Sequence, residues 1–158
     1  MADDLATQIR RTWNTHNRIN LDLLAAIPDE ALNVALKPKG RTVVDLFAHM
    51  HQVRLMWLKP AAPELLKGLD KVPAEPKRKD LVSALTASGG AVARLLEQST
   101  TTNNQIKSFK GGVVTFLAYL ISHESHHRGQ IGWTLKLTDH ALPKDAAYAM
   151  WDWSPSGS

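Results

Sequence analysis

The segment VVTFLAYLISHESHHRGQIGWTLKL, from Val113 to Leu137, predicts both a fold class and a candidate site. Its apolar stripe repeats at steps of three and four residues, which is the period of an amphipathic helix. The stripe consists of Phe116, Leu120, His123, His127, Ile131 and Thr134. Histidines four residues apart on one helical face have Cβ atoms about 5–6 Å apart. The pair His123 and His127 is therefore a natural chelate for a metal ion.

Three earlier segments, residues 4–27, 43–59 and 80–98, show the same helical period. The second begins with a capping-box pattern from Thr42 to Asp45, and Gly89-Gly90 marks a weak or closely packed point in the third. No run alternates with period two for long enough to predict a strand. The pattern predicts an all-α, antiparallel four-helix bundle in which the proline-rich connection 60–79 permits a crossover.

Shorter elements complete this prediction. We expect one helical turn near 64–69, a polar loop at 99–107 and a last turn near 146–151. Residues 1–153 are expected to form one domain, and 154–158 a flexible tail.

The composition excludes several classes of function. The chain has 158 residues, 44% hydrophobic and 22% charged, which is typical of a globular protein and not of a disordered one. Without cysteine it has no disulfide, thiolate-bound zinc or thiol nucleophile. The net charge of +4 comes from scattered residues, so nucleic-acid binding is not expected. The sequence shows no signal peptide and no membrane span, and we expect the protein in the cytoplasm.

The run HESHH at 123–127 also matches a zinc-protease pattern, with Glu124 in the place of the general base. A metzincin would need Gly at 130 and His at 133, where this chain has Gln130 and Trp133. No glutamate follows Glu124 to serve as a third ligand. The protease interpretation is therefore the weakest of those considered.

An upstream ligand fits better, because metal sites in bundles are assembled from facing helices. His49 shares the inward stripe of the second helix with Leu46 and Val53. A three-histidine site would give each of these buried rings a partner. The alternative is that His49 is a core histidine bonded to a carbonyl group.

These residues resemble a known family. The runs HMHQVRLMWL at 49–58, HESHHRGQI at 123–131 and LPKDAAYAMWDW at 142–153 are similar to the DinB-like, or YfiT-like, family of metal-dependent enzymes. The resemblance implies an up-down-down-up four-helix bundle, often a homodimer, with metal ligands at His49, His123 and His127. It also implies chemistry such as zinc-dependent transfer of a low-molecular-weight thiol. Many relatives have Glu at the position of Arg54. A role that this glutamate has in the family therefore cannot be assigned to Arg54.

Three histidines leave an open coordination position, as a catalytic site requires. We expect one divalent ion, zinc first, with nickel, iron or manganese as alternatives. The ion could hold a cosubstrate thiol as thiolate for transfer, or activate water for hydrolysis of a small-molecule substrate. The alternative function is that of a non-catalytic, stress-related bundle that binds metal. A fourth protein ligand, such as Glu124 or Asp139, would favour this alternative.

Other polar and aromatic residues have two interpretations each. Glu124 is a candidate base, or an exposed partner of Arg128 four residues later. His16 and Asn20 interrupt the first helical stripe, and could bond a ligand histidine or form helix-to-helix hydrogen bonds. Gln130 and Tyr119 could line the pocket, or be satisfied core groups. His51 and His126 are expected at the surface or a dimer contact. The tryptophans expected in core and interface packing are Trp57, Trp133, Trp151 and Trp153.

Overall fold

The structure, a computed structural model, describes residues 4–154. Its elements are α1 (Leu5–Ala26), η1 (Asp29–Ala31), α2 (Val43–Ala61), η2 (Pro63–Leu66), α3 (Arg78–Thr102), α4 (Gly112–Leu137) and α5 (Lys144–Ala149). In this described part no strand forms, and Ile106 and Phe109 make an isolated β-bridge. Of the predicted flexible tail, residues 155–158 lie outside the described residues.

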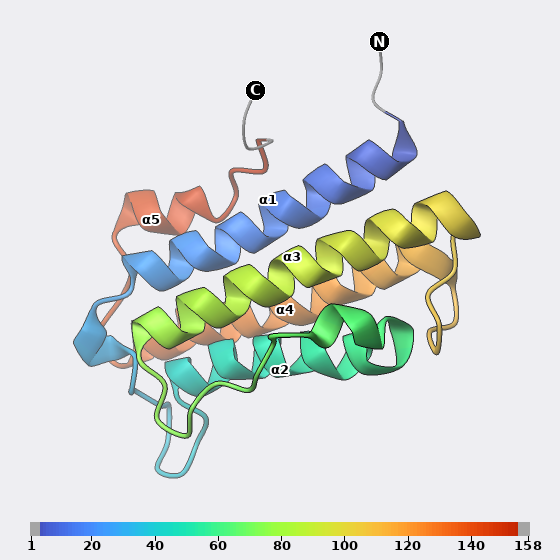
Figure 1. The fold of residues 1–158 in the computed structure, drawn as a ribbon. Helices are drawn as coiled ribbons and strands as arrows, with labels where there is room; N and C mark the ends of the chain where they lie inside the picture. Colours follow the sequence, from blue (N-terminus) through green and yellow to red (C-terminus); the bar gives the residue numbers. More distant parts are fainter. Residues whose placement is uncertain (1–3, 155–158) are drawn as a thin grey trace.

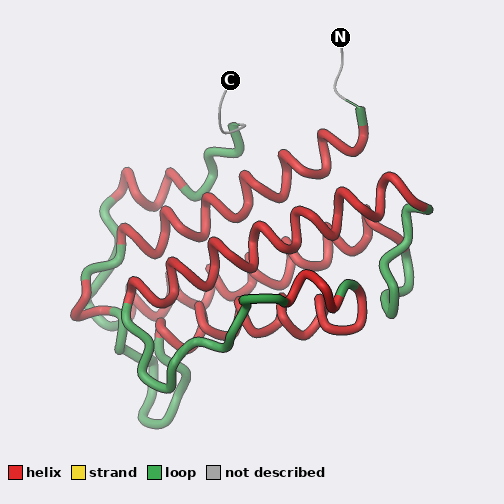
Figure 2. Tube along the Cα trace, in the orientation of Figure 1, coloured by secondary structure: helices red, strands yellow, loops and turns green. Residues whose placement is uncertain are grey.

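The four long helices form the predicted bundle. α1 and α4 run in one direction along it, and α2 and α3 run in the other (Figure 1). α1 packs against α3, α3 against α2, α2 against α4 and α4 against α1, which closes the bundle. Because α2 and α3 are parallel neighbours, the chain must return along the bundle between them, and Figure 2 shows this connection as mostly loop. The up-down-down-up, all-α architecture is confirmed.

The core consists of two apolar clusters separated by a polar layer. One cluster joins Leu23, Phe47 and Leu85 to the C-terminal part of α4, and the other joins Trp13 and Leu58 to the N-terminal part of α4. Each long helix carries buried polar groups between its contributions to the two clusters. These are Thr15, His16, Asn20, His51, Arg54, Ser88, Glu124, His127 and Arg128. Burying so many polar groups is tolerable only if they satisfy one another.

Helix boundaries follow the local sequence with two corrections. The Thr42 hydroxyl accepts the amide of Asp45, and the Asp45 carboxylate accepts the amide of Thr42, so the predicted capping box is present. α2 continues past Pro60 to Ala61, and α3 continues to Thr102 where a loop was predicted from Ser99. Hydroxyl groups at 100–102 donate to carbonyl groups one turn earlier, which satisfies polar side chains inside a helix.

Trp133, Trp151 and Trp153 are not core residues, so that part of the prediction is wrong, whereas their packing in an interface between chains stays a prediction. Trp151 is 79% exposed, Trp133 59% and Trp153 39%. α5 packs against α1 and not over the end of the bundle (Figure 1). Trp57 is half-buried, and its ring packs edge-on against Phe116. None of the helices in the described part is both long and apolar enough to cross a membrane.

Candidate metal centre

Three histidines from α2 and α4 converge in the polar layer. His49, His123 and His127 each offer a ring nitrogen, and these atoms all lie within 4.8 Å of one another. The Nε2 atoms of His123 and His127 are 3.1 Å apart, as expected for residues one turn apart on α4. The His49 ring centroid lies 4.7 Å from that of His127 and 5.3 Å from that of His123. The folding of α2 against α4 thus brings together residues 78 positions apart.

The three imidazoles are held in the neutral form that binds metals. Burial, the charge of Arg41 and the neighbouring rings lower the pKa of His49 to about 4. Burial is also the main cause of the lowered pKa values of His123 and His127, and the neighbouring histidines add to it. At neutral pH the rings therefore carry lone pairs and no positive charge. This donor set fits a divalent ion such as zinc, for which three histidines are a common catalytic ligand set.

Gln130 sets the orientation of one of these rings. Its Oε1 lies 2.7 Å from Nδ1 of His127. Because an amide oxygen only accepts, Nδ1 carries the proton, and Nε2 presents its lone pair to the centre. This is the partner arrangement that fixes the tautomer of a ligand histidine in metal sites. Gln130 therefore lies beside the predicted site, on the stripe that the sequence indicated.

Replacing Gln130 with alanine is expected to weaken metal binding about 10- to 100-fold, because the His127 ring loses the acceptor that fixes it. Competition with a chelating indicator measures this affinity. Gln98→Ala removes an exposed glutamine from α3 and serves as the matched control, with unchanged affinity. Equal affinities in the two variants would contradict an orienting role.

No fourth protein ligand joins the cluster in the described part of the chain. Glu124 and Asp139, the two residues considered for that role, are both outside the group of convergent ligand atoms. The Glu124 carboxylate is turned away into other contacts, and Asp139 is exposed just beyond the end of α4. His49 and His123 are half-buried, so the centre is reachable from solvent. A centre with three ligands and solvent access has the features of a catalytic metal site.

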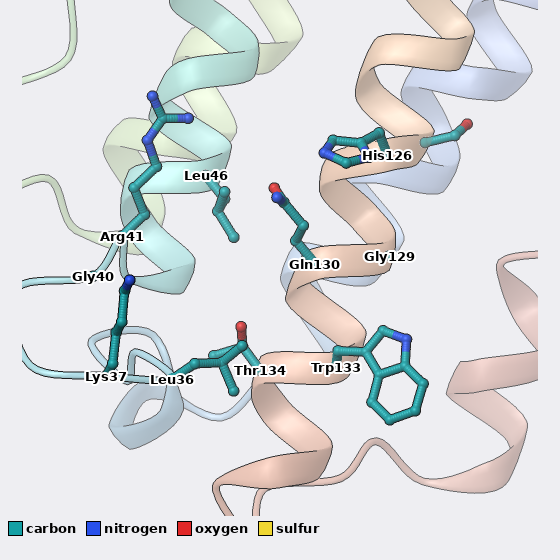
Figure 3. Close-up of a pocket in the computed structure, with 11 residues that line it drawn as sticks. Leu36, Lys37, Gly40, Arg41, Leu46, His126, Gly129, Gln130, Trp133 and Thr134 are labelled. Atoms are coloured by element: carbon teal, nitrogen blue, oxygen red, sulfur yellow. The ribbon is translucent and has the colours of Figure 1, made fainter.

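A cavity of about 820 Å³ lies next to Gln130, the hydrogen-bond partner of His127, and none of the three clustered histidines lines it. Figure 3 shows Lys37 and Arg41 before α2 on one side, and Gln130 of α4 pointing toward Arg41 and Leu46. Trp133 contributes to the α4 wall. The volume lies in the usual range for a small-molecule site, about 300–1,000 Å³. The cavity combines apolar walls with two cationic side chains, and Gln130 links it to His127.

Tyr119 lies on the other side of the centre. Its ring stacks on His123 with centroids 6.3 Å apart, and its hydroxyl accepts a hydrogen bond of 3.4 Å from Trp57 Nε1. The side chain is 36% exposed and does not line the cavity. Tyr119 thus lies beside His123 as a partly exposed residue that also packs against Trp57 and Phe109.

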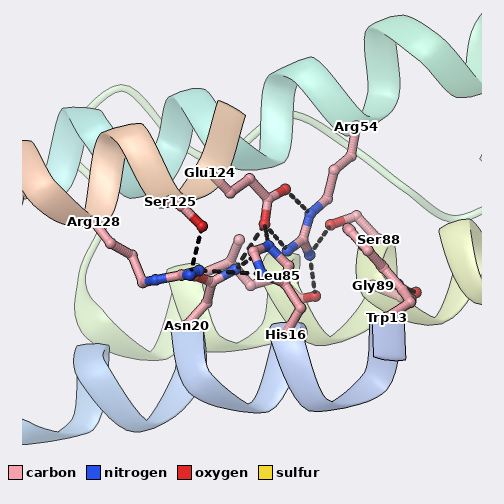
Figure 4. A network of polar contacts seen from close by, with 10 residues as sticks. All are labelled: Trp13, His16, Asn20, Arg54, Leu85, Ser88, Gly89, Glu124, Ser125 and Arg128. Atoms are coloured by element: carbon pink, nitrogen blue, oxygen red, sulfur yellow. Dashed lines mark hydrogen bonds and ion pairs between the residues drawn. The ribbon is translucent and has the colours of Figure 1, made fainter. Parts of the chain in front are cut away.

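Glu124 is fully buried in a network of polar contacts, shown in Figure 4. Its two carboxylate oxygens accept hydrogen bonds from Arg54 at 2.7 and 2.8 Å. Asn20 donates to one of them at 2.7 Å, and His16 Nε2 lies 2.8 Å from it. The interpretation of Glu124 as an exposed partner of Arg128 is therefore wrong. Burial raises the pKa of Glu124, but Arg54 and His16 outweigh this effect and hold the pKa well below its ordinary value.

His16 and Asn20 join α1 to this network. Arg128 donates to Asn20 Oδ1 at 2.7 Å and lies 3.3 Å from His16 Nδ1. Because a guanidinium only donates, His16 accepts at Nδ1 and donates from Nε2 to Glu124. In the described structure these two residues make their contacts with Glu124 and Arg128 and none with a cluster histidine. The second interpretation, helix-to-helix bonding, is the correct one.

The buried neutral His16 predicts a pH-dependent stability. Burial is the main cause of its lowered pKa, so the folded protein does not take up the proton that unfolded His16 binds below about pH 6.5. Stability is therefore expected to fall as pH decreases from 7 to 5, by up to about 1.4 kcal/mol per pH unit for this group. Glu124 keeps its contribution across that range, because a carboxylate whose folded pKa is lowered loses stability only as the pH falls through its ordinary pKa of 4.5. Urea unfolding of the metal-free protein tests this, and a flat profile would contradict it.

The sequence missed several residues that build this region. His51 is 1% exposed, and its Nε2 lies 2.8 Å from the carbonyl oxygen of Asp70, so the predicted surface position is wrong. His126 is exposed, as expected. From the sequence, Arg54 is interpreted only as a departure from the family pattern. Its position between Met50 and Leu58, on the buried face of α2, indicates a buried charge. No sequence pattern marks Arg41 or Lys37 as cavity residues, because both lie in a loop, where no helical period indicates which side chains point inward.

Comparisons with known proteins agree with this description. A sequence profile of the DinB family matches residues 1–154. The crystal structure of YjoA, a DinB-like protein from Bacillus subtilis, has a similar fold, with a TM-score of 0.59 and 18% sequence identity. The match covers 86% of this chain and 96% of that one. No curated protein matches the chain. At this identity the structural likeness concerns the fold alone.

Proposed function

The chain belongs to the DinB family, and on that premise we propose that it is a metal-dependent enzyme that joins a low-molecular-weight thiol to an electrophilic substrate. The observation that carries the proposal is the cluster of His49, His123 and His127, which has no fourth protein ligand in the described residues. A divalent ion bound there would lower the pKa of a thiol or water molecule that coordinates it. We expect zinc, with nickel, iron or manganese as alternatives.

The residues around the centre suit such a reaction. The cavity beside Gln130, of about 820 Å³, has room for two small molecules, and its apolar side chains, such as Leu46, exclude water from part of it. Arg41 adds a positive charge that reaches the centre, as its effect on the pKa of His49 indicates. This charge favours the anionic form of a bound thiol. In the transfer an S–C bond forms, the thiol proton passes to water, and the leaving group departs with its electron pair.

The absence of cysteine supports assigning the thiol to a cosubstrate. Glu124 is not proposed as a base, because Arg54, Asn20 and His16 already occupy its carboxylate. The residues of this chain would therefore act by binding and orientation. Gln130 holds the His127 ring, and the cavity positions the two reactants.

The test is a screen of the metal-loaded protein with small thiols against alkyl and aryl halides, in which the loss of free thiol is followed. We expect turnover in the parent and only the uncatalysed rate in His49→Ala. His140→Ala removes a histidine outside the cluster and is expected to retain the parent rate. Thiol-independent cleavage of esters or amides would identify a hydrolase instead. Bound metal without any turnover would favour a non-catalytic metal-binding bundle.

A further inference from the structure

A second cavity, of about 510 Å³, lies between α4 and the segment 150–153 that follows α5. Its walls include Trp133, Trp151 and Trp153, and two cations, Arg128 and Lys136, line it as well. It shares Ser125, Gly129 and Trp133 with the cavity beside Gln130, and the three clustered histidines line neither cavity. The proposed thiol chemistry makes no use of this site.

The aromatic walls of this cavity are partly or largely exposed to solvent. The three tryptophans are 39–79% exposed. Large exposed apolar surfaces gathered around one hollow usually mark a binding site. Gly132 lies one helical turn from both Arg128 and Lys136, and its Cα has nothing near its side-chain direction within 4 Å. The surface of α4 at Gly132, between the two cations, therefore has open space for a flat ring of a ligand.

The charges of this cavity are unbalanced. The buried network contains two guanidinium groups, of Arg54 and Arg128, and one carboxylate, of Glu124, whose two oxygens both accept from Arg54. Arg128 donates to neutral oxygens of Asn20 and Ser125. No acidic side chain is among the described residues that line the cavity. A cation that is largely removed from water is stabilised by an anion nearby.

Lys136 places a second positive charge against the aromatic wall. Its Nζ lies 5.3 Å from the centroid of the Trp133 ring, within the range of a cation–π contact. The two cations thus lie one turn on either side of Gly132 on α4. Aromatic surface and positive charge are presented together to whatever occupies the cavity.

We propose that this cavity binds a planar aromatic anion, such as an aryl sulfonate or aryl carboxylate. The ring of the ligand packs against Trp133 and Trp151, and its anionic group faces Arg128 and Lys136. Stacking accounts for the exposed indoles, and the anion compensates the excess positive charge of the network. The site includes none of the three clustered histidines.

The probe is naphthalene-2-sulfonate, titrated calorimetrically into the untagged, metal-free protein, with neutral naphthalene-2-sulfonamide for comparison. We expect saturable binding of one sulfonate per chain, and binding of the sulfonamide weaker by about tenfold or more. Lys136→Gln and Trp151→Ala are each expected to weaken sulfonate binding by about tenfold. His49→Ala and Arg41→Gln, which change only the metal centre and its cavity, are expected to bind like the parent.

Three results would overturn the proposal. The first is equal binding of the two probes, or no saturable binding of either. The second is weaker binding in Arg41→Gln with no change in Lys136→Gln, which would place the anion beside the metal centre. The third is a dimer in sedimentation that Trp151→Ala converts to monomer, which would show that a second copy covers this face.

Discussion

His49→Ala is expected to lose stoichiometric metal, whereas the parent protein binds about one divalent ion per chain. The three ligand atoms lie within 4.8 Å of one another, and the described residues supply no fourth that could replace one of them. Loss of a residue that merely orients a ligand costs about 10- to 100-fold in affinity, so loss of a ligand is expected to exceed about a hundredfold. His123→Ala and His127→Ala are expected to behave in the same way.

Metal analysis of untagged protein, before and after incubation with zinc, nickel and manganese, measures this effect. An untagged chain is needed because a histidine tag would bind the same ions. His140→Ala is the matched control, because His140 is a histidine outside the cluster. Unchanged metal content in all three cluster variants would refute the site. A parent protein that takes up no metal would show that the chain has the fold of its family without its metal chemistry.

The second large effect concerns stability. Arg54→Met is expected to lower the free energy of unfolding by about 3–5 kcal/mol, because it leaves the Glu124 carboxylate buried without its charged partner. Both side chains of this ion pair are at most 1% exposed, and their closest atoms are 2.7 Å apart. The variant also loses three further contacts, with the Leu85 carbonyl group, the Ser88 hydroxyl and the Trp13 ring. Urea unfolding measures the difference.

Two further variants show whether the unpaired charge is the cause. Asp22→Ala breaks a largely exposed ion pair with Arg18, leaves the other contacts of Arg18 in place, and is expected to cost less than about 1 kcal/mol. The double variant Arg54→Met with Glu124→Met removes both charges, and is expected to recover part of the lost stability. Recovery stays incomplete, because His16 and Asn20 then lose their acceptor. A double variant less stable than Arg54→Met would contradict this explanation.

The same ion pair connects the core to the metal centre. Glu124 directly follows His123 on α4, and Arg54 follows His49 by five residues on α2. The contact between Arg54 and Glu124 thus ties together the two helices that supply all three ligands. A buried, bidentate contact permits less sliding of two helices than apolar packing does.

The four long helices can be predicted from the sequence alone, because their apolar residues recur with the helical period. The sequence also predicts the pairing of His123 with His127, because residues four apart share a helical face whatever surrounds them. The choice of His49 needed one further step, the rule that bundle sites are built from facing helices. For these features, local geometry was enough.

The partners of the buried polar residues depend on how the helices pack, and local sequence patterns do not predict them. Glu124 and Arg128 are four residues apart, which predicts a surface pair, yet Arg54 from α2 captures the carboxylate. His16, Asn20 and Arg54 are far apart in sequence and meet Glu124 only because α1 and α2 both pack against α4. The exposed tryptophans were misplaced for a similar reason, since hydrophobic character does not tell which side of a helix remains uncovered. Long-range contacts, which no local pattern encodes, settled each of these positions.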